Sequence, residues 1–185
     1  FSATQPVPAL LVWGWLRGDE LVLQPAYHVV TRPSLPARPG STTIEGVDAL
    51  GITVFSLSFD PVPVADISTD ERHFAFAVPL DATGAARLAT IRLRAAGRQV
   101  QTRAAGAPPA GAPATPPTAR RTGPSTIELR WDAAAAPGAL VRDAATGQVL
   151  AFARGGVATI VTAAAMLDVV LSDGVRSSSV RVQVR

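Results

Sequence analysis

Apolar and polar side chains alternate with a period of two along most of the chain. In the run 55–59 the residues Phe, Leu and Phe are separated by serines, and at 180–185 valines alternate with Arg and Gln. Successive side chains of a β-strand point to opposite faces of its sheet, so this spacing predicts strands with one face on a core and one toward solvent. No stretch of ten or more residues has the 3.6-residue period of an amphipathic helix. The pattern therefore predicts an all-β protein.

Turn residues mark the borders of the expected strands. The segments 17–20 (RGDE) and 95–97 (AAG) each separate two strand-like runs, and 173–174 (DG) predicts a two-residue type I′ turn, in which both central residues have positive φ. Short strands joined by regular turns are typical of sandwiches and barrels. About thirteen strands are expected, at 10–16, 21–24, 43–47, 52–59, 73–79, 88–94, 99–103, 127–131, 139–142, 148–153, 157–161, 167–172 and 175–184.

Proline density divides the chain. The segment 31–42 carries three prolines, which lack the amide donor that a central strand needs, and 104–124 carries six, interleaved with Ala and Gly. We therefore expect two Ig-like antiparallel β-sandwiches, 1–103 and 125–185, joined by a Pro/Ala/Gly-rich linker at 104–124. The second has about 60 residues, where burial is marginal, so a single fused body with the linker running over its surface is the alternative.

Composition removes several classes of function. The chain has 185 residues, of which 48% are hydrophobic, and no Cys, so disulfides, thiolate catalysis and cysteine-based metal sites are excluded. All 17 basic residues are Arg, but residues 1–103 have nine Arg and nine acidic residues, and the net charge is only +3. This balance predicts no nucleic-acid partner. No apolar run reaches the length of about 18 residues that a membrane span needs, so none is expected in this chain.

The two histidines, His28 and His73, are the residues from which a zinc hydrolase would have to be built, together with a loop Asp. They lie far apart in the sequence on predicted strands, without an HExxH motif, and the chain has no GxSxG nucleophile elbow. A hydrolase therefore stays a second alternative. The favoured expectation is that the chain has no catalytic residue, no metal and no cofactor.

Aromatic residues offer a different kind of site. Trp13 and Trp15 flank Gly14, so both rings lie on one face of a predicted strand. Two large rings beside an apolar residue favour a place in the core. The alternative is a platform for sugar stacking, formed with Tyr27, in which Gly14 lets a ligand approach. Trp131 continues an alternating strand and is expected to anchor the core of the second sandwich.

A family resemblance rests on several short runs. The segments 11–14 (LVWG), 23–27 (LQPAY), 58–61 (SFDP) and 74–79 (FAFAVP), with 138–156 and 167–174 later, are similar to the C-terminal β-sandwich region of large secreted bacterial proteins, some with an upstream metallopeptidase domain. The resemblance implies an accessory module whose partners are the upstream domain of the same polypeptide or a surface protein or glycan, outside the cell or in its envelope. It carries over no catalytic residue, because the chain lacks a zinc-binding helix.

Together these observations predict a non-catalytic accessory or interaction module of a larger exported bacterial protein. A carbohydrate-binding module is the first alternative. The chain begins at Phe1 without an initiator Met, so we expect either a removed leader or a piece of a longer protein.

Overall fold

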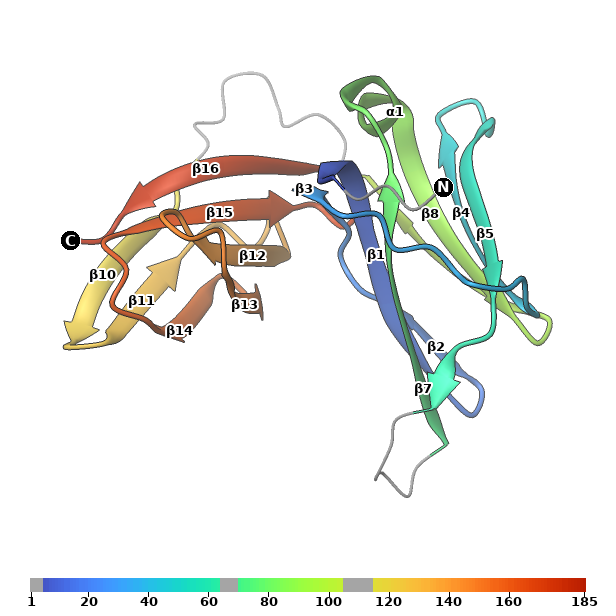
Figure 1. Ribbon diagram of the computed structural model, residues 1–185, viewed down its shortest axis with the longest axis horizontal. Helices are drawn as coiled ribbons and strands as arrows, with labels where there is room; N and C mark the ends of the chain where they lie inside the picture. The colour runs from blue at the N-terminus through green and yellow to red at the C-terminus, as the bar shows by residue number, and fades with distance from the viewer. Residues whose placement is uncertain (1–4, 64–69, 105–114) are drawn as a thin grey trace. The chain divides into compact units, whose positions relative to one another are not determined.

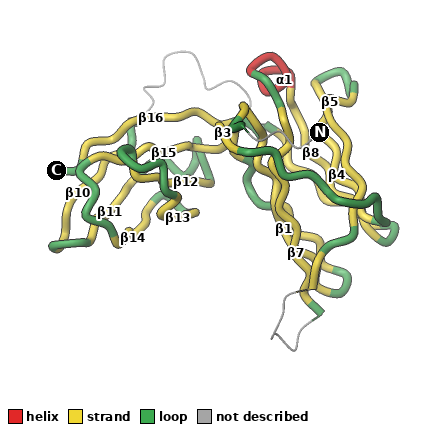
Figure 2. The backbone as a smooth tube through the Cα atoms, in the orientation of Figure 1, coloured by secondary structure: helices red, strands yellow, loops and turns green. Residues whose placement is uncertain are grey.

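A computed structural model describes residues 5–63, 70–104 and 115–185. The all-β prediction is confirmed, since the described residues form sixteen strands and one short helix (Figures 1 and 2). The chain divides into two compact units, Phe1–Ala104 (unit 1) and Ala105–Arg185 (unit 2). No helix in the described ranges is long and apolar enough to cross a membrane.

Unit 1 contains a sheet built around one long strand, which we call the β1 sheet. β1 pairs antiparallel with β2 and β3 along one edge and with β7 along the other, and β6 extends the sheet beyond β7 (Figure 1). Its strands are β1 (Val7–Arg17), β2 (Glu20–Leu23), β3 (Tyr27–Thr31), β6 (Val62–Pro63) and β7 (Glu71–Pro79).

The second sheet of unit 1, the β4 sheet, has the antiparallel order β5-β4-β8-β9. The two sheets share an aromatic core, because the Phe59 ring lies 5.1 Å from the Phe74 ring and 4.8 Å from the Phe76 ring across the gap between them. The elements are β4 (Thr42–Asp48), β5 (Thr53–Phe59), α1 (Ala82–Arg87), β8 (Leu88–Ala95) and β9 (Arg98–Arg103).

Unit 2 also has two antiparallel sheets, the β11 sheet with order β10-β11-β14 and the β12 sheet with order β13-β12-β15-β16. Both contribute to one apolar core, in which Trp131 is 7% exposed, as the sequence predicted. Its indole Nε1 donates to the Ala136 carbonyl oxygen at 2.8 Å. The strands are β10 (Thr118–Gly123), β11 (Thr126–Arg130), β12 (Gly138–Asp143), β13 (Val149–Arg154), β14 (Val157–Val161), β15 (Met166–Ser172) and β16 (Ser177–Gln183).

One predicted turn has a different form. Among the described residues, only Ala96 combines a side chain with positive φ, so Asp173 is not a central residue of a type I′ turn. The Asp173 N–H donates to the Arg176 carbonyl oxygen at 3.0 Å, which leaves Gly174 and Val175 at the tip. The Asp173 carboxylate accepts from the N–H groups of Val175 and Arg176. A backbone bond and the Asp173 side chain therefore close this hairpin together, whereas Ala96 and Gly97 (φ 49° and 76°) form the positive-φ turn between β8 and β9.

The linker expected at 104–124 includes a strand at its C-terminal end. Residues 118–123 form β10, which pairs with β11. Prolines stand just before this strand and just after it, and none lies inside it. The prolines on both sides of this strand therefore led to its assignment to the linker, although the strand itself contains none. Residues 105–114 of the expected linker lie outside the described residues. The sequence also missed β3, β6 and α1, the last being a single short helix capped by Asp81, which accepts from the Gly84 N–H at 2.7 Å.

Candidate functional site

β1 has two apolar faces, and they have different neighbours. Ala9 aside, the fully buried side chains belong to the even positions, where Leu10 and Val12 are at most 1% exposed. Trp13 and Trp15 are half-buried and project from the opposite face of the sheet. The expectation that both rings fill the core was wrong, because alternation fixes which residues share a face but not which face is covered.

Gly14 serves the core and not a ligand. It lies on the same face as Val12, and a Cβ built there would collide with the Val22 carbonyl oxygen of β2 and come within 2.8 Å of the Phe74 ring. Real Cβ atoms do not approach other atoms so closely. The absent side chain thus makes room for the backbone of β2 and for Phe74, which corrects the expectation that Gly14 opens a path to a ligand.

Charged and polar side chains border the tryptophans. Residues directly opposite each other in an antiparallel pair project to the same face, and β7 places His73 opposite Trp15 and Glu71 opposite Arg17. The Glu71 carboxylate accepts from the Arg17 guanidinium, with Nε at 2.9 Å from Oε2, and its other oxygen lies 2.6 Å from His73 Nε2. We call the surface formed by Trp13, Trp15, Arg17, Glu71 and His73 the tryptophan face.

The electrostatics of the tryptophan face follow from these bonds. The hydrogen bond from Arg17, with a smaller contribution from His73, lowers the pKa of Glu71 below its usual value, and the same bond raises the pKa of Arg17. The Arg17 guanidinium carbon lies 5.2 Å from the Trp15 ring centroid, within cation–π range. Arg17 is thus held over Trp15 by Glu71, and the two charges compensate each other.

The ring of Trp13 is oriented by a hydrogen bond at its edge. Trp13 Nε1 donates to the Pro25 carbonyl oxygen at 3.1 Å. The residue opposite Trp13 on β7 is Ala75, which is exposed and too small to cover the indole. The result is an oriented, partly open ring beside a second ring with a charged border. Such a surface can stack on an apolar face of a ligand while planar polar groups hydrogen-bond its rim.

Tyr27, the third residue of the predicted platform, is opposite Leu11 and so belongs to the same face of the sheet as the tryptophans. It is 1% exposed, whereas both tryptophans are half-buried. The structure therefore brings the three rings onto one face, but with unequal access to solvent. A role for them in binding stays a prediction.

The two histidines do not meet. His28 is opposite Leu10 on the core-facing side of the β1 sheet, where its Nε2 lies 2.8 Å from the Leu80 carbonyl oxygen. His73 is opposite Trp15 on the other side. The site that a zinc hydrolase would need is therefore not assembled from this pair. Within the described ranges, no group of three or more His, Asp or Glu side chains is placed to hold a metal ion.

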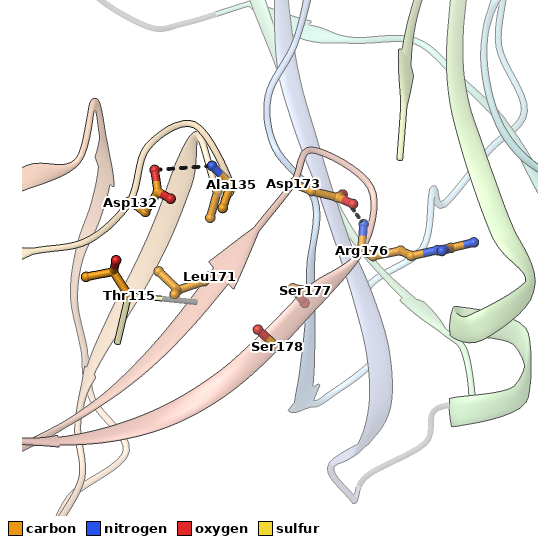
Figure 3. Close-up of a pocket in the computed structure, with 9 residues that line it drawn as sticks. Thr115, Asp132, Ala135, Leu171, Asp173, Arg176, Ser177 and Ser178 are labelled. Carbon is orange, nitrogen blue, oxygen red and sulfur yellow. Dashed lines mark hydrogen bonds between the residues drawn. The ribbon is translucent and has the colours of Figure 1, made fainter. Parts of the chain in front are cut away.

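The sequence did not predict a pocket of about 330 Å³ in unit 2, between the β11–β12 loop and the β15–β16 hairpin (Figure 3). Its two carboxylates are engaged by backbone. Asp132 accepts from the N–H groups of Ala134 and Ala135, and Asp173 closes its own hairpin. These acids shape the two loops. In the sequence, an Asp just before each turn was the feature that could have indicated them. The pocket is lined by Thr115, Asp132, Ala135, Ala136, Leu171, Asp173, Arg176, Ser177 and Ser178.

Comparisons with known proteins give little. No family model matches the chain, and no curated protein matches it. A solved structure described as "Biofilm associated protein - BSP domain" is similar at 13% identity, with a TM-score of 0.28. The match covers 97% of this chain but only 29% of that one, so this chain spans less than a third of its length. At this TM-score the likeness supports no conclusion about fold or function.

Proposed function

We propose that the chain is a non-catalytic interaction module, made of two Ig-like β-sandwich units, of a larger exported bacterial protein, and that it binds its ligand at the tryptophan face. The observation that carries the proposal is the half-burial of Trp13 and Trp15 on the outer face of a sheet, beside a bonded Arg17–Glu71–His73 group. An upstream domain of the same polypeptide is the partner that the sequence resemblance suggests.

The rings favour a glycan as the ligand. The indoles of Trp13 and Trp15 present flat apolar surface, and the C–H faces of a pyranose ring pack well on such surfaces. Arg17, Glu71 and His73 add donors and acceptors at the rim, which suits the hydroxyl groups around a sugar ring. Specific sugar binding needs both kinds of contact, and the tryptophan face provides them side by side.

The charge balance of the tryptophan face favours neutral sugars. The carboxylate of Glu71 accepts from Arg17 and compensates its charge. A polyanionic ligand would have to compete with Glu71 for the guanidinium, whereas a neutral hydroxyl can bond to the rim without breaking this pair. We therefore expect neutral β- or α-glucans, mannans or xylans to bind more tightly than sulfated or uronic-acid polymers.

Affinity electrophoresis and titration calorimetry with these polysaccharides test the proposal. Trp15→Ala should weaken binding of a neutral glycan at least about tenfold, because stacking on one ring contributes about 1.5 kcal/mol. Trp13→Ala should weaken it similarly. Phe152→Ala, which truncates an aromatic side chain that is 47% exposed in unit 2, is the matched control and should leave binding unchanged.

Fluorescence gives an independent measurement on the same protein. Trp131 is buried, so acrylamide quenching reports mainly on Trp13 and Trp15. A bound glycan should protect them from the quencher. If no neutral or charged glycan changes the quenching, and Trp15→Ala binds every polymer as the wild type does, the tryptophan face is not a glycan site.

A further inference from the structure

β14 is an edge strand of the β11 sheet, with β11 as its only strand partner in the part of the chain that the structure describes. Its sequence, Val-Ala-Thr-Ile-Val, contains no charge and no proline. Val157 is 50% exposed and Val161 is 77% exposed, so the apolar side chains at both ends of the strand face solvent. An exposed, uncharged apolar edge is a template for pairing with another strand.

The register of β11 and β14 shows which backbone groups of β14 point outward. The Trp131 N–H donates to Gly156 and the Thr162 N–H donates to Ser125, at the two ends of the ladder. Hydrogen-bonded and non-bonded pairs alternate in an antiparallel ladder, and this one has no bulge. The N–H and C=O groups of Val157, Thr159 and Val161 therefore point away from β11, toward the free edge.

The other edge strands that the structure describes in unit 2 are protected. β10 carries Arg120 and Arg121 and contains a register shift, and β16 carries Arg181. β13 ends in Arg154 and lies beside a register shift in β12. Arginines and bulges both oppose edge-to-edge association, because like charges would face each other and the bulge twists the edge away. β14 has neither protection.

We propose that β14 pairs with β14 of a second copy of this chain, antiparallel and centred on Thr159, in a two-fold symmetric dimer. In this register each of the outward-facing residues exchanges both backbone hydrogen bonds with its partner, Thr159 with Thr159 and Val157 with Val161. The side-chain pairs that form are Thr–Thr and Val–Val, which stabilise sheets.

A second copy fits better than an unrelated strand for two reasons. The segment is nearly symmetric about Thr159, with Val at both ends, and an isologous interface requires that each half match the other. No charged side chain of one β14 faces a charge of the other, which cannot be said of β10 or β16 paired with themselves. A dimer also carries two tryptophan faces, so a polymeric ligand would bind with avidity.

Sedimentation velocity on the full chain at increasing concentration, up to about 1 mM, tests the proposal. The wild type should pass from the mass of one chain to twice that mass. Thr159→Lys should weaken this association at least about tenfold, because the two lysines would face each other at the centre of the interface. The fold should tolerate this change, since Thr159 is exposed and opposite Glu128 on β11. Thr53→Lys, the same change at an exposed strand residue of unit 1, is the matched control and should dimerise as the wild type does.

A disulfide tests the register itself. The chain has no Cys, so Thr159→Cys introduces a single thiol. In the proposed pairing the two Cα atoms at position 159 lie about 5.5 Å apart, within disulfide range. Mild oxidation should therefore cross-link Thr159→Cys into a dimer, and Thr53→Cys should not cross-link at the same concentration.

Two results would overturn the proposal. One is a wild-type chain that stays monomeric over the whole concentration range, which would leave the β14 edge to a strand of another protein. The other is a dimer that Thr159→Lys does not weaken and that Thr159→Cys does not cross-link, because such a dimer uses another surface.

Discussion

Tryptophans in the two units stand in similar sequence contexts but have different surroundings. Trp131 follows β11, in phase with Ile127 and Leu129, and all three are buried. Trp13 and Trp15 lie on β1, in phase with Leu11, and remain half-buried on the face opposite to the core. The difference lies in the residues that alternate with the tryptophan positions in each strand. In β11 the intervening positions are polar, whereas in β1 they are as apolar as the tryptophan positions.

The period of a strand pattern and the face that is covered are therefore separate pieces of information. Where only one face of a strand is apolar, as in β11, the sequence fixes both the strand and the side that is covered. Where both faces are apolar, as in β1, the sequence fixes only which residues share a face. A strand with two apolar faces has something to cover or bind on each side, and on β1 the second side is the tryptophan face.

Truncating the buried ring of Trp131 should cost the most stability. Trp131→Ala should lower the free energy of unfolding by about 3 to 5 kcal/mol, since it removes a core side chain and leaves an Nε1 hydrogen bond to Ala136 unmade. Trp13→Ala should lower it by about 1 to 2 kcal/mol, because part of that ring is already in water. Urea denaturation measures both. Equal losses for the two variants would mean that Trp13 is a core residue and would remove the basis of the tryptophan face.

A smaller effect is expected at Gly14, which lies on the core face of β1 between the two tryptophans. Gly14→Ala should destabilise the chain by about 1 to 3 kcal/mol or more, because the added methyl overlaps both the Val22 carbonyl oxygen of β2 and the Phe74 ring. Gly123→Ala is the matched control, since its nearest neighbour would be 3.5 Å from the added carbon and its φ is not positive. Thermal or urea unfolding that ranks the two substitutions the other way would show that Gly14 does not serve core packing.

Much of the architecture was available from the sequence, for identifiable reasons. The hairpin at 17–20 formed as expected, with Gly18 at positive φ, because its turn residues permit few alternatives. β3 was missed because Tyr27–Thr31 shows no clear alternation and pairs with β1 through tertiary context. The bond between Arg17 and Glu71 joins residues 54 positions apart, so no local pattern could reveal it. That Glu71 and His73 border the rings could not be predicted either, since it depends on the register of β7 against β1.

The last and weakest effect concerns the charged border of the tryptophan face, formed by Arg17, Glu71 and His73. Arg17 and His73 lower the pKa of Glu71 in the folded chain below its usual value of 4.5, so the ionised carboxylate favours the folded state. This contribution is fully present above that value and is lost as the pH falls through the lowered pKa of the folded state.

The variant Glu71→Gln lacks this contribution at every pH. The urea midpoint of the wild type should therefore exceed that of Glu71→Gln at about pH 7, and the two should converge at acidic pH, below the lowered pKa of Glu71. High salt should also reduce the difference at neutral pH, because the Arg17 side chain is 54% exposed, although that of Glu71 is only 14% exposed. Midpoints that differ by the same amount at both pH values would show that Glu71 acts by packing, and Arg17 would then not be held over Trp15 by charge.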